Sequence, residues 1–113
     1  MIVEGTNISM IKGDTEVIEV SCRDIEGNPV PFENGDKVYL TVKTSTNTAE
    51  KILQKVVTDF IDGIACIEIQ PKDTKELLCR AYVYDIQLTR ADGSVKTIIP
   101  PSSFIVRGEV TYE

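Results

Sequence analysis

The clearest structural signal in the chain is a strict alternation of apolar and polar residues over positions 81–89. One side of this segment carries four large apolar residues, Tyr82, Tyr84, Ile86 and Leu88. A period of two over this length predicts a half-buried β-strand. We expect both tyrosines to face the core, with the Tyr82 hydroxyl bonded to the backbone as in a tyrosine corner.

The residues just before this strand predict a short helical turn near positions 73–78. Asp73 is expected to cap the turn, and Glu76 lies three residues later, where it completes a capping box. Leu77 and Leu78 are expected to close the turn against the core. A helical turn that crosses between sheets ahead of a tyrosine-bearing strand is typical of an immunoglobulin-type β-sandwich.

Hydrophobic patterning predicts seven further strands, at 6–11, 15–22, 37–44, 50–60, 64–70, 95–99 and 104–112. The clearest inward-facing residues outside 81–89 are Ile18, Val20, Cys22, Val38, Leu40 and Val42. The sequence therefore predicts an all-β protein. We expect a single domain over residues 1–113, an immunoglobulin-like antiparallel β-sandwich of about eight strands with one short helical turn.

Residues 50–60 admit two interpretations. Their apolar positions also suit one face of a helix with a period of 3.6. We favour a strand, because Asp62 and Gly63 follow it as a strong hairpin signal and 64–70 has a clear strand pattern. A helix there would leave 64–70 without its hairpin partner.

Other turn signals set the remaining connections. Asp92 and Gly93 suit a type I′ turn between two strands. Pro100 and Pro101 cannot donate to a β-ladder, so the chain should lie at an edge or a bulge there. The long loop at 23–36 is expected to anchor on the core through two apolar residues, Val30 and Phe32.

Composition excludes several classes of function. The chain of 113 residues has a net charge of −6, which argues against binding to a nucleic-acid backbone. No apolar run approaches the ~20 residues of a membrane helix, and the N-terminus lacks the pattern of a signal peptide. We therefore expect a cytoplasmic site of synthesis and no membrane partner. In that reducing compartment, the three cysteines, Cys22, Cys66 and Cys79, should be small core residues, with a Cys22–Cys66 bridge as the alternative.

No residue pattern predicts a catalytic centre, a cofactor or a metal site. Histidine is absent, which removes the commonest general base and metal ligand. The loop at 24–28 loosely resembles an oxygen-rich calcium loop, but a β-turn with Gly27 at the positive-φ position is the preferred interpretation. Carboxylates that might pair for glycosidase chemistry are Glu33, Asp36, Asp59, Asp62 and Asp85. We expect no enzyme, because most of these lie in turns where aspartate is favoured for backbone reasons.

Two kinds of binding surface remain. Tyr82 and Tyr84 could line a sugar-binding platform, although a core pair is favoured. Outward apolar residues on strands, Val83, Ile98 and Ile105, point instead to patches that a partner protein would cover, and hence to an assembly or adaptor module.

Several short patterns resemble small phage and prophage proteins of Gram-positive bacteria, in particular the N-terminal β-sandwich domain of the tail baseplate upper protein family. The patterns are Gly13-Asp14-Thr15, Pro71-x-Asp73-Thr74-x-x-Leu77, Tyr82-x-Tyr84-Asp85-Ile86-Gln87-Leu88, Phe104-x-Val106 and Val110-Thr111. The matched positions have structural roles, so the resemblance implies no catalytic or cofactor-binding residues. The family continues into a helical segment and a receptor-related region, whereas this sequence ends at Glu113.

The resemblance implies a non-enzymatic virion component. Its partners would be other tail or baseplate proteins, or further copies of itself, and its location would be the host cytoplasm during assembly and then the virion. Contacts are expected from strand edges and from the loop at 23–36. The alternative function is a small carbohydrate-binding module.

Overall fold

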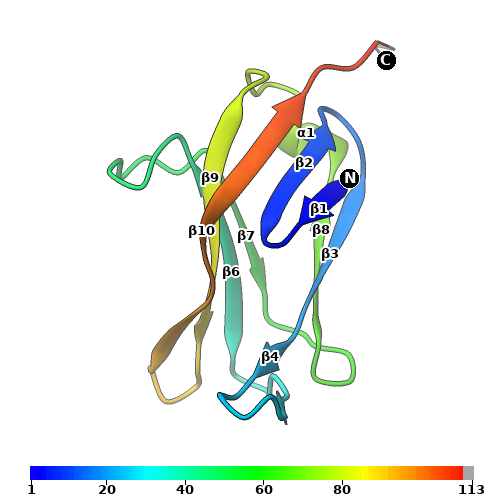
Figure 1. Cartoon of the computed structure of the whole chain (residues 1–113). Helices are drawn as coiled ribbons and strands as arrows, with labels where there is room; N and C mark the ends of the chain where they lie inside the picture. The colour runs from blue at the N-terminus through cyan, green and yellow to red at the C-terminus, as the bar shows by residue number, and fades with distance from the viewer. Residues whose placement is uncertain (111–113) are drawn as a thin grey trace.

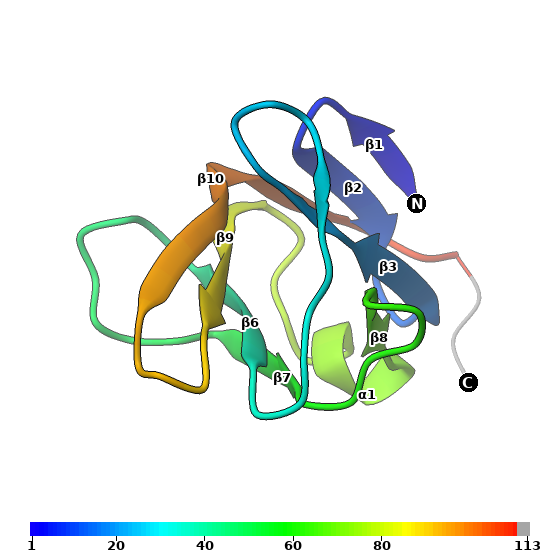
Figure 2. The same cartoon turned by 90° about the horizontal axis from the view of Figure 1, so that it is seen from below.

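The computed structural model describes residues 1–110, which form two packed layers of β-strands and confirm the all-β sandwich (Figures 1 and 2). There are ten strands in this part of the chain, rather than about eight. They are β1 (Ile2–Glu4), β2 (Asn7–Ile11), β3 (Glu16–Val20), β4 (Cys22–Arg23), β5 (Pro29–Val30), β6 (Lys37–Lys43), β7 (Leu53–Val57), β8 (Ala65–Ile69), β9 (Ala81–Thr89) and β10 (Val95–Arg107). The one helix, α1 (Pro71–Thr74), lies between β8 and β9.

The strand order is that of an immunoglobulin fold. The large layer has the order β1-β2-β10-β9-β6-β7, and the opposite layer is the pair β3-β8. Strands β10, β9, β6 and β7 correspond in order to strands G, F, C and C′ of that fold, and the facing pair β3-β8 corresponds to strands B and E. The short pair β4-β5 forms a separate hairpin at the start of the long loop predicted at 23–36, and its first residue, Cys22, was predicted as the end of the strand at 15–22.

Alternating residues of the central strands fill the space between the layers, as predicted. In β9, the four apolar residues Tyr82, Tyr84, Ile86 and Leu88 are each no more than 4% exposed. In β6, Val38, Leu40 and Val42 are fully buried. Phe32 is also buried and Val30 packs against the core, so the long loop is anchored by the predicted residues.

The helical turn begins earlier than predicted, and its cap is different. Gln70 is the N-cap, and Pro71 occupies the first helical position. Asp73 is therefore the third helical residue, and its carboxylate accepts a 2.7 Å hydrogen bond from the backbone N–H of Gln70. The reason is that proline is pre-organised for the first helical position, which fixes the start of the turn at 71. Glu76 lies beyond the helix and is exposed, so it takes no part in the cap.

The two leucines after α1 separate. Leu77 packs against the core, as predicted, whereas Leu78 is 75% exposed. The prediction for Leu78 was wrong because the turn ends before it, and the side chain no longer lies on the buried side.

The hairpin predicted at Asp62 and Gly63 forms only as a turn. Both residues have positive φ (52° and 73°), and Ile61 and Ile64 exchange backbone hydrogen bonds as in a type I′ turn. The flanking strands then separate into different layers: β7 pairs with β6, and β8 pairs with β3. Residues 53–57 are indeed a strand rather than a helix, but their partner was predicted wrongly.

The connection between β9 and β10 also differs from prediction. Gly93 has a φ of 90°, whereas Asp92 stays outside the positive-φ region, so the turn is not type I′. The Asp92 carboxylate instead accepts hydrogen bonds from the amide and hydroxyl of Ser94. Gly93 N–H bonds to the Arg90 carbonyl and Arg90 N–H to the Ser94 carbonyl, which is the pattern of a turn followed by a glycine bulge.

The last strand runs continuously from Val95 to Arg107 and contains the two prolines. Its register against β9 shifts between Ile99 and Ser102, which confirms the predicted bulge at Pro100 and Pro101. After the bulge, β10 pairs with β2 in parallel, so the large sheet is mixed and not wholly antiparallel as predicted. Two strands were predicted here, at 95–99 and 104–112, whereas the structure has one strand that ends at Arg107. Positions 111–113, including Thr111 of the family resemblance, lie outside the described residues.

Candidate functional site

The two tyrosines singled out from the sequence both donate hydrogen bonds to the backbone. The Tyr82 hydroxyl donates a 2.8 Å hydrogen bond to the carbonyl of Leu78, which is the predicted tyrosine corner. The Tyr84 hydroxyl donates to the carbonyl of Thr6, and burial raises the pKa of Tyr84. Both rings are about 4% exposed, so neither can form a sugar-binding platform.

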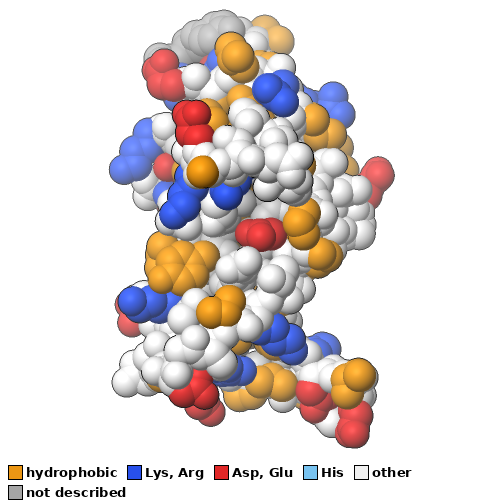
Figure 3. Space-filling model, turned by 90° about the vertical axis from the view of Figure 1, so that its left-hand side faces the viewer, with side chains coloured by type: hydrophobic (Ala, Val, Ile, Leu, Met, Phe, Trp, Pro, Cys, Tyr) orange, Lys and Arg blue, Asp and Glu red, His pale blue; other side chains and the backbone are white. Residues whose placement is uncertain are grey.

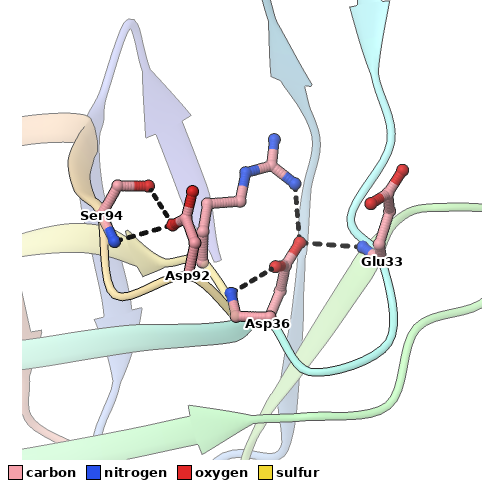
Figure 4. Close-up of polar contacts among 6 residues, drawn as sticks. Glu33, Asp36, Asp92 and Ser94 are labelled. Atoms are coloured by element: carbon pink, nitrogen blue, oxygen red, sulfur yellow. Dashed lines mark hydrogen bonds and ion pairs between the residues drawn. The ribbon is translucent and has the colours of Figure 1, made fainter.

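The carboxylate of Asp36 is buried, since only 3% of this residue is exposed. Figure 4 shows its polar contacts. It accepts hydrogen bonds from the backbone N–H groups of Glu33 (2.9 Å) and Ala91 (3.3 Å), and it pairs with Arg90 at 2.7 Å. Burial raises the pKa of Asp36, but the Glu33 hydrogen bond and the charge of Arg90 outweigh it and leave that pKa below its usual value. These contacts occupy the carboxylate, and they join the loop before β6 to the β9–β10 turn.

The other carboxylates considered for catalysis do not form a pair with it. Glu33 contributes its backbone N–H to Asp36 rather than its carboxylate (Figure 4). Asp59 and Asp62 are exposed beside the turn between β7 and β8, and Asp85 lies in the middle of β9 on the opposite side from the core. The hydrogen bonds and the ion pair of the Asp36 carboxylate therefore involve none of the other candidate carboxylates.

The loop at 24–28 is a β-turn, as preferred from sequence. Gly27 has a φ of 86°, and the Asp24 carboxylate accepts hydrogen bonds from the backbone N–H groups of Glu26 and Asn28. The Asn28 bond is the main cause that lowers the pKa of Asp24. Within residues 1–110, no group of three or more cysteine or carboxylate side chains is placed to hold a metal ion.

The cysteines were predicted as core residues, and only one of them is. Cys22 is buried, whereas Cys66 and Cys79 are exposed, and all three are free thiols. Cys66 alternates with the buried residues Ala65 and Ile67 along β8, so its side chain points outward. The alternative Cys22–Cys66 bridge does not form.

A cleft of about 380 Å³ lies on the outer face of the large sheet, and we call it the outer cleft. Its floor is formed by side chains of β6, β7 and β9, one wall by the loop at 44–52, and the other by the proline bulge of β10. Figure 2 shows that loop projecting from the outer side of the large sheet. Figure 3 looks at this side of the molecule, where charged and polar side chains lie among isolated hydrophobic ones.

Hydrogen bonds organise the floor of the outer cleft. The Gln54 side-chain amide donates to the Thr41 hydroxyl at 3.0 Å, and the Lys51 ammonium donates to the Gln54 carbonyl oxygen at 3.5 Å. Asp85 lies directly opposite Thr41 on the neighbouring strand. The four ion pairs found among residues 1–110 do not include Lys43, Lys51 or Asp85.

A second opening, also of about 380 Å³, lies between the β1–β2 hairpin and β3, and we call it the edge crevice. It is bordered by β3 residues 17–20 on one side and by Val3 and Ile8 on the other, with Tyr84 and Ile86 also lining it. Among the strands of residues 1–110, β3 pairs only with β8, and β1 pairs only with β2. Within this part of the chain, the edge of β3 that faces the crevice is therefore hydrogen-bonded to no other strand.

Sequence patterns did not predict either opening. The outer cleft depends on the position of the polar loop at 44–52, and the edge crevice depends on which strands fail to pair. The nearest signals were the gap between the strands predicted at 37–44 and 50–60 and the expectation that contacts come from strand edges.

A scan against protein-family models and a search of the curated proteins both find no match to the chain. Within residues 1–110, no helix is long and apolar enough to cross a membrane.

Proposed function

We propose that the protein is a non-enzymatic docking module that binds an extended segment of another protein in the edge crevice, beside β3. The observation that carries this proposal is the unpaired edge of β3 next to an opening lined by apolar side chains. Exposed strand edges present unpaired backbone N–H and C=O groups, and adding a strand satisfies them.

The chemistry of the crevice specifies the occupant. A strand placed beside β3 would make main-chain hydrogen bonds along Glu16–Val20 and direct every second side chain towards Ile18, Val20 and Ile86. Its other side chains would point outward beside Val17, which is 51% exposed. The partner segment therefore has apolar residues at alternate positions.

Charge around the crevice favours a basic segment. Glu4, Glu16 and Glu19 lie on the strands that border it, and the whole chain carries a net charge of −6. Glu16 is paired with the amino group of Met1 at 2.8 Å, which leaves Glu4 and Glu19 to attract the partner. Complementary charge of this kind mainly increases association rate and selectivity.

A docking role through a strand edge suits a tail or baseplate component of a phage or prophage, the class that the sequence resembles. The partner would then be another tail protein or a second copy of the chain. The absence of histidine, the commonest general base, supports a function without catalysis.

Carbohydrate binding is the second candidate function, and one observation favours it: the outer cleft is lined mainly by polar side chains. Tyr84 cannot contribute to it through its ring, because that ring is buried. Tyr39 remains available, since it lies on the outer face of β6 beside Gln87.

Selection of random 12-residue peptides displayed on a surface, followed by binding measurements on the purified protein, tests the docking proposal. We expect peptides with apolar residues at every second position and basic residues between them. In amide hydrogen exchange, the bound peptide should newly protect backbone N–H groups within Glu16–Val20. Light scattering of the free protein should be measured first, because a defined oligomer would identify a second copy as the source of the strand.

Two matched variants make the test specific. Val17 and Val56 are exposed to similar extents, 51% and 47%, on strands of opposite layers. Val17→Lys should abolish peptide binding or dissociate the oligomer, because it places bulk and positive charge at the crevice, whereas Val56→Lys should leave both unchanged. Three results would each overturn the proposal: selected peptides without alternating apolar residues, protection of amides in β7 or β8 instead of β3, and equal effects of the two variants.

A further inference from the structure

We infer that the outer cleft binds an acidic sugar, a polyhydroxylated ring that carries a carboxylate. This inference rests on the second candidate function, carbohydrate binding in the outer cleft, and names its ligand class. It does not depend on the docking proposal, because the outer cleft lies on the outer face of the large sheet and the edge crevice lies between the layers. The volume of the outer cleft, about 380 Å³, falls within the range of ~300–1,000 Å³ that is usual for small-ligand sites.

The charges in the cleft favour a monoanion. It contains two lysines, Lys43 and Lys51, and one carboxylate, Asp85, so it is locally positive in a chain of net charge −6. Lys43 is half-buried, and its cross-strand neighbour is Val83 rather than a carboxylate. A ligand carboxylate beside Lys43 would give this ammonium group the ionic partner that residues 1–110 do not supply.

The neutral groups in the cleft favour hydroxyls on the rest of the ligand. Besides the charged residues, the lining includes the side chains of Thr41, Ser45, Thr46, Gln54 and Gln87. Because the Thr41 oxygen already accepts a hydrogen bond from Gln54, its own hydrogen is available for donation. Asp85 supplies acceptors for ligand hydroxyls, and each amide supplies both donors and acceptors.

The cleft also has apolar surface for the C–H face of a sugar ring. Val83 lies on the floor, and Pro101 forms part of the wall. Tyr39 is paired in register with Gln87, next to the Thr41–Asp85 pair on the same face of the sheet. Its ring can therefore contact a second sugar unit. A short saccharide with the acidic sugar near Lys43 and its neighbour near Tyr39 fits this arrangement.

Titration followed by ¹H–¹⁵N NMR tests this inference with defined probes: glucuronate, glucose, acetate and inorganic phosphate. We expect glucuronate to cause saturable shifts in the amides of β6 and β9 that border the cleft, and to bind about tenfold more tightly than glucose. Acetate and phosphate, which carry charge without a sugar ring, should bind more weakly than glucuronate.

Lys43→Gln and Lys96→Gln are matched variants, because each removes one positive charge from a strand of the large sheet, and only Lys43 lines the cleft. Lys43→Gln should weaken glucuronate binding about tenfold and leave glucose binding unchanged, and Lys96→Gln should change neither. Three results would each overturn the inference. They are the absence of a saturable shift up to about 50 mM glucuronate, an affinity for glucose or phosphate equal to that for glucuronate, and an effect of Lys96→Gln equal to that of Lys43→Gln. Peptide binding in the edge crevice should be unaffected by Lys43→Gln, so the two proposals succeed or fail separately.

Discussion

The guanidinium of Arg90 lies 2.7 Å from the carboxylate of Asp36, although the two residues are 54 positions apart in the chain. Asp36 directly precedes β6, and Arg90 directly follows β9. Because these strands are neighbours in the large sheet, the ion pair holds one end of the sheet together. It also satisfies a carboxylate that is almost completely removed from water.

We expect Asp36→Ala to lower the free energy of unfolding by about 2–4 kcal/mol, because it leaves the Arg90 charge and two backbone N–H groups without their partner. Urea unfolding followed by circular dichroism measures the change. Asp92→Ala is the control, since Asp92 is exposed and bonds only to Ser94 within its own turn. A comparable loss in the control would show that the turn, rather than the buried ion pair, is responsible.

Stability should fall as pH drops below about 4. Burial opposes ionisation of Asp36 and Asp73, but hydrogen bonds and nearby cations leave the pKa of each carboxyl below its usual value; for Asp73 these are Lys55, the Gln70 N–H and Lys72. Groups with a lowered folded-state pKa stabilise the protein fully above the unfolded-state pKa and lose that contribution as pH falls through the folded-state pKa. Urea midpoints from pH 7 to pH 2 should show this decline. The decline should be shallower in Asp36→Asn, and an identical pH profile would contradict the assignment.

The tyrosine corner should contribute measurably to stability. Tyr82→Phe removes only the hydroxyl that donates to the Leu78 carbonyl, so we expect a loss of about 1 kcal/mol in the free energy of unfolding. Thermal or urea unfolding measures it. Tyr39→Phe provides the comparison, because Tyr39 lies on the outer face of β6 and should change stability little.

Gly63 should tolerate a side chain less well than Gly27, although both have positive φ (73° and 86°). An added Cβ at Gly63 would lie 2.5 Å from Cβ and 3.0 Å from Cα of Pro31, whereas nothing lies within 4 Å at Gly27. Gly27→Ala should therefore cost about 1 kcal/mol from backbone strain alone, and Gly63→Ala should cost about 1–3 kcal/mol more. Chemical unfolding of both variants provides the measurement, and equal costs would argue against the close approach of Pro31.

The three thiols should differ in reactivity. Cys66 and Cys79 are exposed, and Cys22 is buried, so a thiol reagent such as Ellman's should modify two groups rapidly in the native protein. The third should react only on unfolding. Serine substitution at each position in turn would assign the groups, and rapid reaction of Cys22 in the native state would contradict its burial.

Patterns within one segment predicted the fold well, because burial of a strand face depends on local alternation. Tyr82 to Leu88 in β9 and Val38 to Val42 in β6 were placed correctly for this reason. The Asp62–Gly63 turn was also predicted correctly, since its geometry follows from the two residues themselves. The pairing of the two strands that flank this turn was not predicted correctly. They pair in different layers, β7 with β6 and β8 with β3, and this choice depends on residues far away in the sequence.

The helix cap and the two openings were missed for different reasons. Asp73 was taken as the N-cap of α1, but Pro71, two residues earlier, occupies the first helical position and sets the start of the helix. The outer cleft and the edge crevice arise from residues far apart in sequence: Lys43 with Asp85, and Val3 with β3. No local pattern records such contacts.

The parallel pairing of β2 with β10 has a consequence for how the chain folds. Ile8 lies opposite Phe104, so nearly the whole sequence separates the two strands. Contacts between such distant segments carry a large loop-closure cost and slow folding. During synthesis, the apolar face of β2, with Ile8 and Met10, cannot pack beside β10 until residues 104–107 have been made. Until then, the edge of β2 that β10 later covers is open to pairing with another molecule.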